Sequence, residues 1–229
     1  SQNLTAASTY FGMGTVQYSK ENYTLALDYY KKALDIYLAH YSEDSHIIAV
    51  IYNNIANIYD FKGKASLALE YYQKSLKIKR LLFDEDHPSL AITYNNLASL
   101  YSKEKDYDQA ISYYIKSLKL KKKYPGKHDS EIAIIHYNLA LAYQNQENFE
   151  LAMSNYKDCL RLLQQNSNPQ LISSCYESLT RINMRLGNMK DALFYDKLSS
   201  ASRKKEVQPH GILPVTVTSV NQIHGETYL

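Results

Sequence analysis

The stretch Tyr94-Asn95-Asn96-Leu97-Ala98-Ser99-Leu100-Tyr101, followed by Ala110 and Tyr114, decides the fold because its pattern returns along most of the chain. An alanine recurs every 42 residues, and each copy is followed four positions later by a tyrosine. A period between about twenty and fifty residues is typical of a repeat array rather than a single compact fold. The pairs are Ala26 and Tyr30, Ala68 and Tyr72, Ala110 and Tyr114, and Ala152 and Tyr156.

A second small residue stands twelve positions before each of these alanines. Small residues at this separation let two antiparallel helices approach closely, because neither presents bulk where the helix axes cross. Between them, Lys62-Gly63-Lys64 interrupts the helical spacing in the second unit. The sequence therefore predicts a stack of helical hairpins. The small residues are Gly14, Ala56, Ala98 and Ala140, and the five units begin near Ala7, Ala49, Ala91, Ala133 and Ser173.

Helix starts are marked at one register position by Ser45, His87 and Asp129. Pro88 follows His87 directly, and Asn168-Pro169 has the same form before the last unit. A proline is tolerated in the first helical turn, where its missing N–H has no partner in any case. We expect a helix to begin at each of these places.

Composition limits the functional classes. The formal charge of +3 and the pI of about 8.6 give no indication of nucleic-acid binding. No stretch approaches the ~20 apolar residues that span a bilayer, so no membrane partner is expected. Cys159 and Cys175 fall at small-residue packing positions and are expected to be reduced thiols. Because the first residues carry no secretory signal, cytoplasmic localisation is the default expectation.

No motif for chemistry is found in the sequence. It contains no glycine-rich phosphate loop, no nucleophile elbow and no cysteine–histidine cluster with metal-ligand spacing. His136 falls at a helix packing position, and the 23 tyrosines follow the packing register. We therefore expect no enzyme activity, no cofactor and no metal site.

These units resemble tetratricopeptide repeats, and their 42-residue length is similar to that of kinesin light chain repeats. The resemblance rests on the segment 86–101, with Tyr107, Ala110, Tyr114 and Leu118 following it. It implies an all-α fold, a right-handed superhelical α-solenoid of about five hairpins over residues 3–205. Residues 206–229 are expected to form an extended or flexible tail, because Pro209, Gly211 and Pro214 interrupt helix there.

In this family the first helix of each hairpin lines a concave groove, so the resemblance implies which side chains face a ligand. Asparagine is a mediocre helix former, and its recurrence there needs a reason beyond helix propensity. Its amide can both donate to and accept from the main chain of an extended peptide. The predicted peptide-binding residues are Asn53, Asn54, Asn57, Asn95, Asn96, Ser99, Lys103, Tyr137, Asn138, Leu141, Arg181 and Arg185, in a groove that also includes Glu177 and Ser178.

Lys103, Arg181 and Arg185 add positive charge to this predicted groove, which would favour acidic ligands or a terminal carboxylate. The alternative interpretation of the amides is that they tie neighbouring hairpins together. The predicted function is that of a non-enzymatic adaptor or scaffold that binds an extended segment of a partner protein. One rival is the regulatory part of a multidomain enzyme or signalling protein, autoinhibited by its own tail. Another is a purely structural spacer.

The tail has its own possible roles. The ending Thr227-Tyr228-Leu229 resembles a ligand of PDZ domains. The segment Ile212–Val220 alternates β-branched and hydroxyl residues and could fold back along the array as a cap or groove ligand. A plain linker is the third interpretation.

Overall fold

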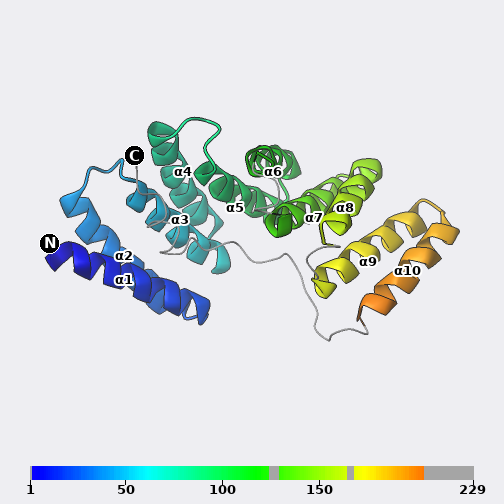
Figure 1. Ribbon diagram of the computed structural model, residues 1–229, viewed down its shortest axis with the longest axis horizontal. Helices are drawn as coiled ribbons and strands as arrows, with labels where there is room; N and C mark the ends of the chain where they lie inside the picture. The colour runs from blue at the N-terminus through cyan, green and yellow to red at the C-terminus, as the bar shows by residue number, and fades with distance from the viewer. Residues whose placement is uncertain (1, 124–128, 164–167, 204–229) are drawn as a thin grey trace. The chain divides into compact units, whose positions relative to one another are not determined.

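The computed structural model describes residues 2–123, 129–163 and 168–203, and this part of the chain forms ten α-helices without a strand (Figure 1). The all-α class and the helix–turn–helix repeat predicted from the sequence are confirmed. The predicted tail, with its PDZ-type ending, lies outside the described residues. The helices are α1 (Gln2–Ser19), α2 (Tyr23–His40), α3 (His46–Phe61), α4 (Ala65–Leu82), α5 (Ser89–Lys103), α6 (Tyr107–Lys121), α7 (Asp129–Asn145), α8 (Phe149–Leu163), α9 (Pro169–Arg185) and α10 (Met189–Arg203).

The turn inside each hairpin has the same backbone geometry. One residue per turn has a positive φ, between 61° and 77°, and the five positions are equivalent in the repeat. Glycine adopts this conformation without strain, whereas other residues meet a steric penalty from Cβ. The five residues are Glu21, Gly63, Lys105, Glu147 and Gly187.

The helix starts follow the sequence signals closely. The Asn168 side chain accepts a hydrogen bond from the backbone N–H of Leu171 at 3.1 Å, and Pro169 is the first residue of α9. Ser45 is the N-cap residue of α3. The fifth helix begins at Ser89, after Pro88, where the His87 ring nitrogen accepts from the Ser89 N–H.

The chain divides into two compact units with their boundary between Leu100 and Tyr101, within α5. We call residues 2–100 the N-terminal unit and the described residues from 101 onward the C-terminal unit. The continuous array over residues 3–205 stays a prediction.

In the N-terminal unit the small residues permit close helix packing as expected. A Cβ atom placed on Gly14 would lie only 2.6 Å from the Tyr30 ring, and Ala56 and Ala98 are fully buried. Tyr30 and Tyr72 are fully buried against these positions. The small residues and tyrosines of the repeat therefore pack the helices together.

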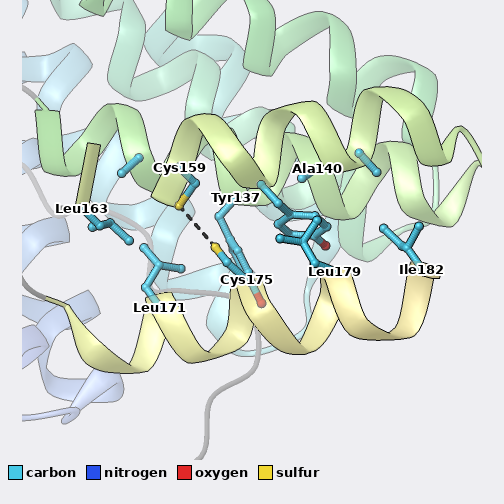
Figure 2. Packing of buried hydrophobic residues seen from close by; sticks show 11 residues of the cluster. Tyr137, Ala140, Cys159, Leu163, Leu171, Cys175, Leu179 and Ile182 are labelled. Atoms are coloured by element: carbon cyan, nitrogen blue, oxygen red, sulfur yellow. Dashed lines mark hydrogen bonds between the residues drawn. The ribbon is translucent and has the colours of Figure 1, made fainter. Parts of the chain in front are cut away.

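The core of the C-terminal unit is built from α7, α8 and α9 (Figure 2). Tyr137, Leu163, Leu179 and Ile182 belong to the same cluster as the two cysteines. Cys159 and Cys175 are buried free thiols, with their sulfur atoms 3.5 Å apart. Burial also raises the pKa of the Cys175 thiol well above its usual value.

Candidate functional site

The predicted groove residues of the N-terminal unit are mostly buried. Asn53, Asn54, Asn57 and Asn96 have no exposed surface, and Ser99 is 3% exposed. Asn95 is half-buried. In the described structure these amides therefore lie inside the packing between helices.

Three of these amides bond to one another across two hairpins. The Asn96 Nδ2 group donates to Asn57 Oδ1 at 3.0 Å, and it lies 3.4 Å from Asn53 Oδ1. The Tyr72 hydroxyl donates to the same Asn57 oxygen at 2.7 Å, and Thr93 Oγ1 donates to Asn53 at 3.2 Å. We call these five side chains the amide network.

A buried lysine extends the amide network. Lys79 is 2% exposed, and its ammonium group donates to the Ser89 carbonyl and to Thr93 Oγ1, each at 3.0 Å. Asn54 has a separate partner, because a hydrogen bond with it is among the contributions that lower the pKa of Tyr30. These bonds join neighbouring hairpins, as the alternative interpretation of the sequence proposed. Among the described residues, the buried Asn53 Nδ2, Asn95 Oδ1 and Asn96 Oδ1 atoms have no hydrogen-bond partner. Direct contact of these amides with a peptide stays a prediction, and it would require these buried atoms to become accessible.

The C-terminal unit combines buried and accessible groove residues. Tyr137 and Asn138 are buried, Leu141 is half-buried, and Lys103, Arg181 and Arg185 are exposed. Within the described residues the Asn138 Oδ1 atom has no hydrogen-bond partner. The accessible members of the predicted set therefore belong mainly to α9.

A pocket of about 280 Å³ opens where α7 and α9 end. The turn between α7 and α8 and the first residue of α8 supply the opposite wall from α9. The lining residues are Gln144, Asn145, Glu147, Phe149, Arg181, Ile182 and Arg185.

The two arginines of this pocket differ in their partners. Arg185 donates to Glu147 Oε1 at 2.6 Å, and its guanidinium lies 5.2 Å from the centre of the Phe149 ring. Arg181 donates to Ser178 Oγ at 3.1 Å and has no acidic partner among the residues described. The charge of Arg185 is thus compensated, whereas that of Arg181 is available to an anion.

Hydrogen bonds hold the pocket wall behind Arg181 in place. The Tyr156 hydroxyl donates to Gln144 Oε1 at 2.9 Å, and a hydrogen bond with Ser178 acts on the same tyrosine. Burial raises the pKa of Tyr137 above its usual value, while the positive charge of Arg181 is among the contributions that lower it. A guanidinium on a rigid wall is preorganised for a carboxylate, with which it forms two parallel hydrogen bonds.

Sequence reasoning missed Glu147 and Phe149 as members of this site. The available signal was that Glu147 stands at the repeat position of Gly63 and Gly187, where its φ of 61° is unfavourable for a side-chain residue. Glu21 and Lys105 share this position and its positive φ, so the signal does not single out Glu147. The ion pair of Glu147 with Arg185 is seen only in the structure.

This arrangement can hold an anionic group. Across residues 2–123, 129–163 and 168–203, no cluster of histidine, cysteine, aspartate or glutamate is placed to hold a metal ion. Nor is any helix in these ranges both long and apolar enough to cross a bilayer.

The sequence matches a family profile described as tetratricopeptide repeat, over residues 4–81, 48–123 and 89–165. A comparison with curated proteins gave no significant match.

Among solved structures, the chain is similar to BtubC from P. vanneervenii, with 19% identity, a TM-score of 0.74, and coverage of 90% of this chain and 84% of that one. It is also similar to the kinesin-light-chain-type, nearly identical TPR-like repeats of Podosopora anserina, with 14% identity, a TM-score of 0.72, and coverage of 86% and 95%.

Aspartyl phosphate phosphatase F from Bacillus subtilis is a third similar structure, with 18% identity and a TM-score of 0.72. The chain is covered over 89% of its length but spans only 52% of that protein. At these identities the likeness shows a shared fold.

Proposed function

The chain belongs to the tetratricopeptide-repeat family, and we propose that it is a protein-interaction module that binds an acidic group of an extended partner segment beside Arg181. The acidic group is a side-chain or terminal carboxylate. The α7–α9 pocket defined above holds it, while the half-buried Leu141 and the neighbouring α9 surface contact the rest of the segment.

The observation that carries this proposal is the uncompensated charge of Arg181. Its guanidinium is exposed at a pocket wall, and its partner is the neutral hydroxyl of Ser178. A hydrogen bond to a charged group contributes about 1.5–3 kcal/mol, roughly twice that of a neutral pair. One carboxylate in this pocket would therefore supply a large share of the affinity of a short peptide.

The pocket also favours acidic over neutral ligands. Glu147 already compensates Arg185, so one net positive charge remains between the two arginines and the glutamate. A neutral ligand would lose the charge-assisted bond, and a basic ligand would meet repulsion from Arg181. The net positive charge of the pocket therefore favours acidic ligands.

The proposal is tested by titrating the full chain with a fluorescein-labelled peptide of alternating Asp and Leu. A matched peptide with Asn for each Asp is the reference ligand. We expect the Asp peptide to bind more tightly, and Arg181→Ala to weaken its binding by roughly tenfold. Fluorescence anisotropy measures both dissociation constants.

Arg161→Ala is the matched control, because Arg161 is exposed, is paired with Asp158 and lies outside the pocket. It should leave the affinity for the Asp peptide unchanged. Equal affinity for the Asp and Asn peptides, or equal losses in the two arginine variants, would reject the pocket as the recognition site.

The rival function, a regulatory portion of a larger protein held inactive by its own tail, makes a different prediction for the same titration. Deleting residues 206–229 should then increase the affinity for the Asp peptide. Unchanged affinity after deletion supports the plain interaction module.

A further inference from the structure

Successive hairpins meet through one repeated contact within each unit. The first residue of a second helix packs against the end of the next first helix. In the N-terminal unit the rings of Tyr23 and Phe61 are stacked 4.8 Å apart, and in the C-terminal unit Phe149 lies under Arg185. Lys62, which follows Phe61, donates to Oγ1 of Thr24, which follows Tyr23. At the junction of α6 with α7, Gln146 donates to Asp108 at the equivalent positions. This recurring junction is a property of the repeat.

Among the described residues, nothing packs on this half of the junction in α10. Met189 stands at the repeat position of Phe149, and Leu193 stands at that of Met153, whose sulfur accepts from Asn183 of α9. Met189 is 61% exposed and Leu193 is 63% exposed. The face continues through Asp196 and Ser200, which are also exposed. These four residues form the outer α10 face.

The first helix presents the other half of the junction. Met13 is 44% exposed and Val16 is 50% exposed, whereas their equivalents on α3 and α9 are fully or almost fully buried under the preceding hairpin. Those equivalents are Ile55, Ile58, Leu179 and Ile182. With Thr9 and Lys20, Met13 and Val16 form the outer α1 face.

We infer that the outer α10 face of one copy of this chain binds the outer α1 face of a second copy, head to tail, and reproduces the internal junction. In that junction the start of the second helix meets the end of the next first helix, so the two helices run antiparallel. The contact therefore brings Met189 and Leu193 of one copy against Val16 and Met13 of the other.

The polar halves of the two faces match in the same alignment. Asp196 stands at the repeat position of the buried Tyr156, and Ser200 stands at that of Leu160. At the facing end of α1, Thr9 stands where α9 has Cys175. The same register thus places apolar residues against apolar residues at one end of the contact and polar residues against polar residues at the other. A second copy is the occupant that supplies this complement, since both halves are encoded in one chain.

The alignment contains one unfavourable pair. Lys20 stands at the repeat position of Lys62 and Gln146, and Lys190 stands at that of their partners Thr24 and Asp108. Lys20 of one copy should therefore face Lys190 of the other. Like charges at such a distance repel each other. Lys190→Glu should therefore tighten self-association by about twofold to fivefold at low salt, and added salt should reduce that gain.

Sedimentation equilibrium of the 229-residue chain tests the inference. We expect concentration-dependent self-association, which Leu193→Asp and Met13→Asp each weaken by roughly tenfold or more, because each places a charge in an apolar contact. The decisive arm mixes the two variants. Each keeps one intact face, so the mixture should form a heterodimer and stop there, as a heterologous contact requires.

Phe194→Ser is the matched control. Phe194 is 57% exposed, but it lies beside the outer α10 face at the position where α8 has the exposed Ser154. It should not change self-association. Circular dichroism checks that each variant folds, and Leu193→Asn with Met13→Gln replaces the aspartate pair if either does not.

Other occupants give other results, and each overturns the inference. A chain that stays monomeric at all concentrations excludes the second copy, and self-association that appears only after deletion of residues 204–229 assigns the outer α10 face to that segment. Loss of association in Leu193→Asp but not in Met13→Asp indicates an α10-to-α10 contact instead.

Discussion

Helices α3 and α9 carry their polar residues at the same places in the repeat, but the surroundings of these residues differ. Asn53, Asn54 and Asn57 on α3 are fully buried and bond to neighbouring helices. On α9 the equivalent places hold Glu177, Ser178 and Arg181, of which Arg181 is exposed at a pocket. The N-terminal unit therefore uses these positions for cohesion, and the C-terminal unit keeps one of them available.

The difference shows that a register position fixes the direction of a side chain but not its availability. Amides can satisfy one another when a neighbouring helix brings a second set within reach, and buried polar groups are nearly always paired in this way. A guanidinium longer than an amide reaches past the helix packing to solvent. Four predictions test this contrast, taken from the largest expected effect to the smallest.

Removing the centre of the amide network should destabilise the N-terminal unit most. Asn57→Ala takes away the acceptor of the buried Tyr72 hydroxyl, and it leaves the Asn96 amide with only its longer bond to Asn53. We expect the free energy of unfolding to fall by about 2–4 kcal/mol, as measured by urea denaturation. Asn145→Ala is the control, because Asn145 is exposed and bonds only to a main-chain carbonyl. Equal losses in both variants would contradict the contrast.

Alkaline pH should destabilise the protein through its buried tyrosines. Burial raises the pKa of Tyr30 from 10.0 to about 12, so the folded protein retains a proton that the unfolded chain releases. The stabilising contribution is complete below pH 10 and is lost as the pH rises toward 12. For Tyr30 this is about 1 kcal/mol per pH unit. Urea denaturation across this range measures the slope, which should be smaller in Tyr30→Phe. A slope that stays the same in this variant would contradict the assignment.

Two equivalent tyrosines should differ in what their hydroxyl groups contribute. The Tyr72 hydroxyl donates within the buried amide network, whereas that of Tyr156 donates to the half-buried Gln144. Tyr72→Phe should cost about 1–2 kcal/mol in thermal unfolding, and Tyr156→Phe about 0.5–1 kcal/mol. The reverse order would mean that the C-terminal unit depends on its polar contacts as much as the N-terminal unit does.

The smallest effect is expected at the turn that borders the pocket. Lys105→Gly and Glu147→Gly both relieve a positive φ, so each should gain up to about 1 kcal/mol, less the exposed ion pair that Glu147 loses. Only Glu147→Gly releases Arg185, and it should strengthen binding of the Asp peptide by about twofold to fivefold. A change in affinity in Lys105→Gly would show that the effect comes from the backbone rather than from the charge.

Much of the fold was accessible from single residues and their spacing. Ala56 and Ala98 predicted close helix contacts because a small side chain lets two crossing helices approach each other, and both alanines are buried as expected. Asn168-Pro169 predicted the start of α9 because an N-cap side chain accepts a hydrogen bond from a backbone N–H in the first turn of the same helix. These signals are local, so they are visible without the neighbouring hairpins.

The candidate site was only partly accessible in this way. Arg181 and Arg185 were predicted to carry positive charge, but the partner of Arg185 is Glu147, 38 positions earlier in the chain. The bonding of Asn96 was equally hidden, because its partners Asn53 and Asn57 belong to another hairpin. Such pairs depend on which helices are adjacent in space.

The sequence by itself determined the repeat length, the helical hairpins, the packing tyrosines and the absence of recognisable catalytic motifs, because each follows from local spacing and side-chain size. The tertiary structure alone decided that the amides of α3 are enclosed. It also decided that, within residues 2–123, 129–163 and 168–203, Arg181 has no acidic partner and nothing covers the outer faces of α1 and α10. Burial and hydrogen bonding are set by neighbours distant in the chain, and no register position can specify them.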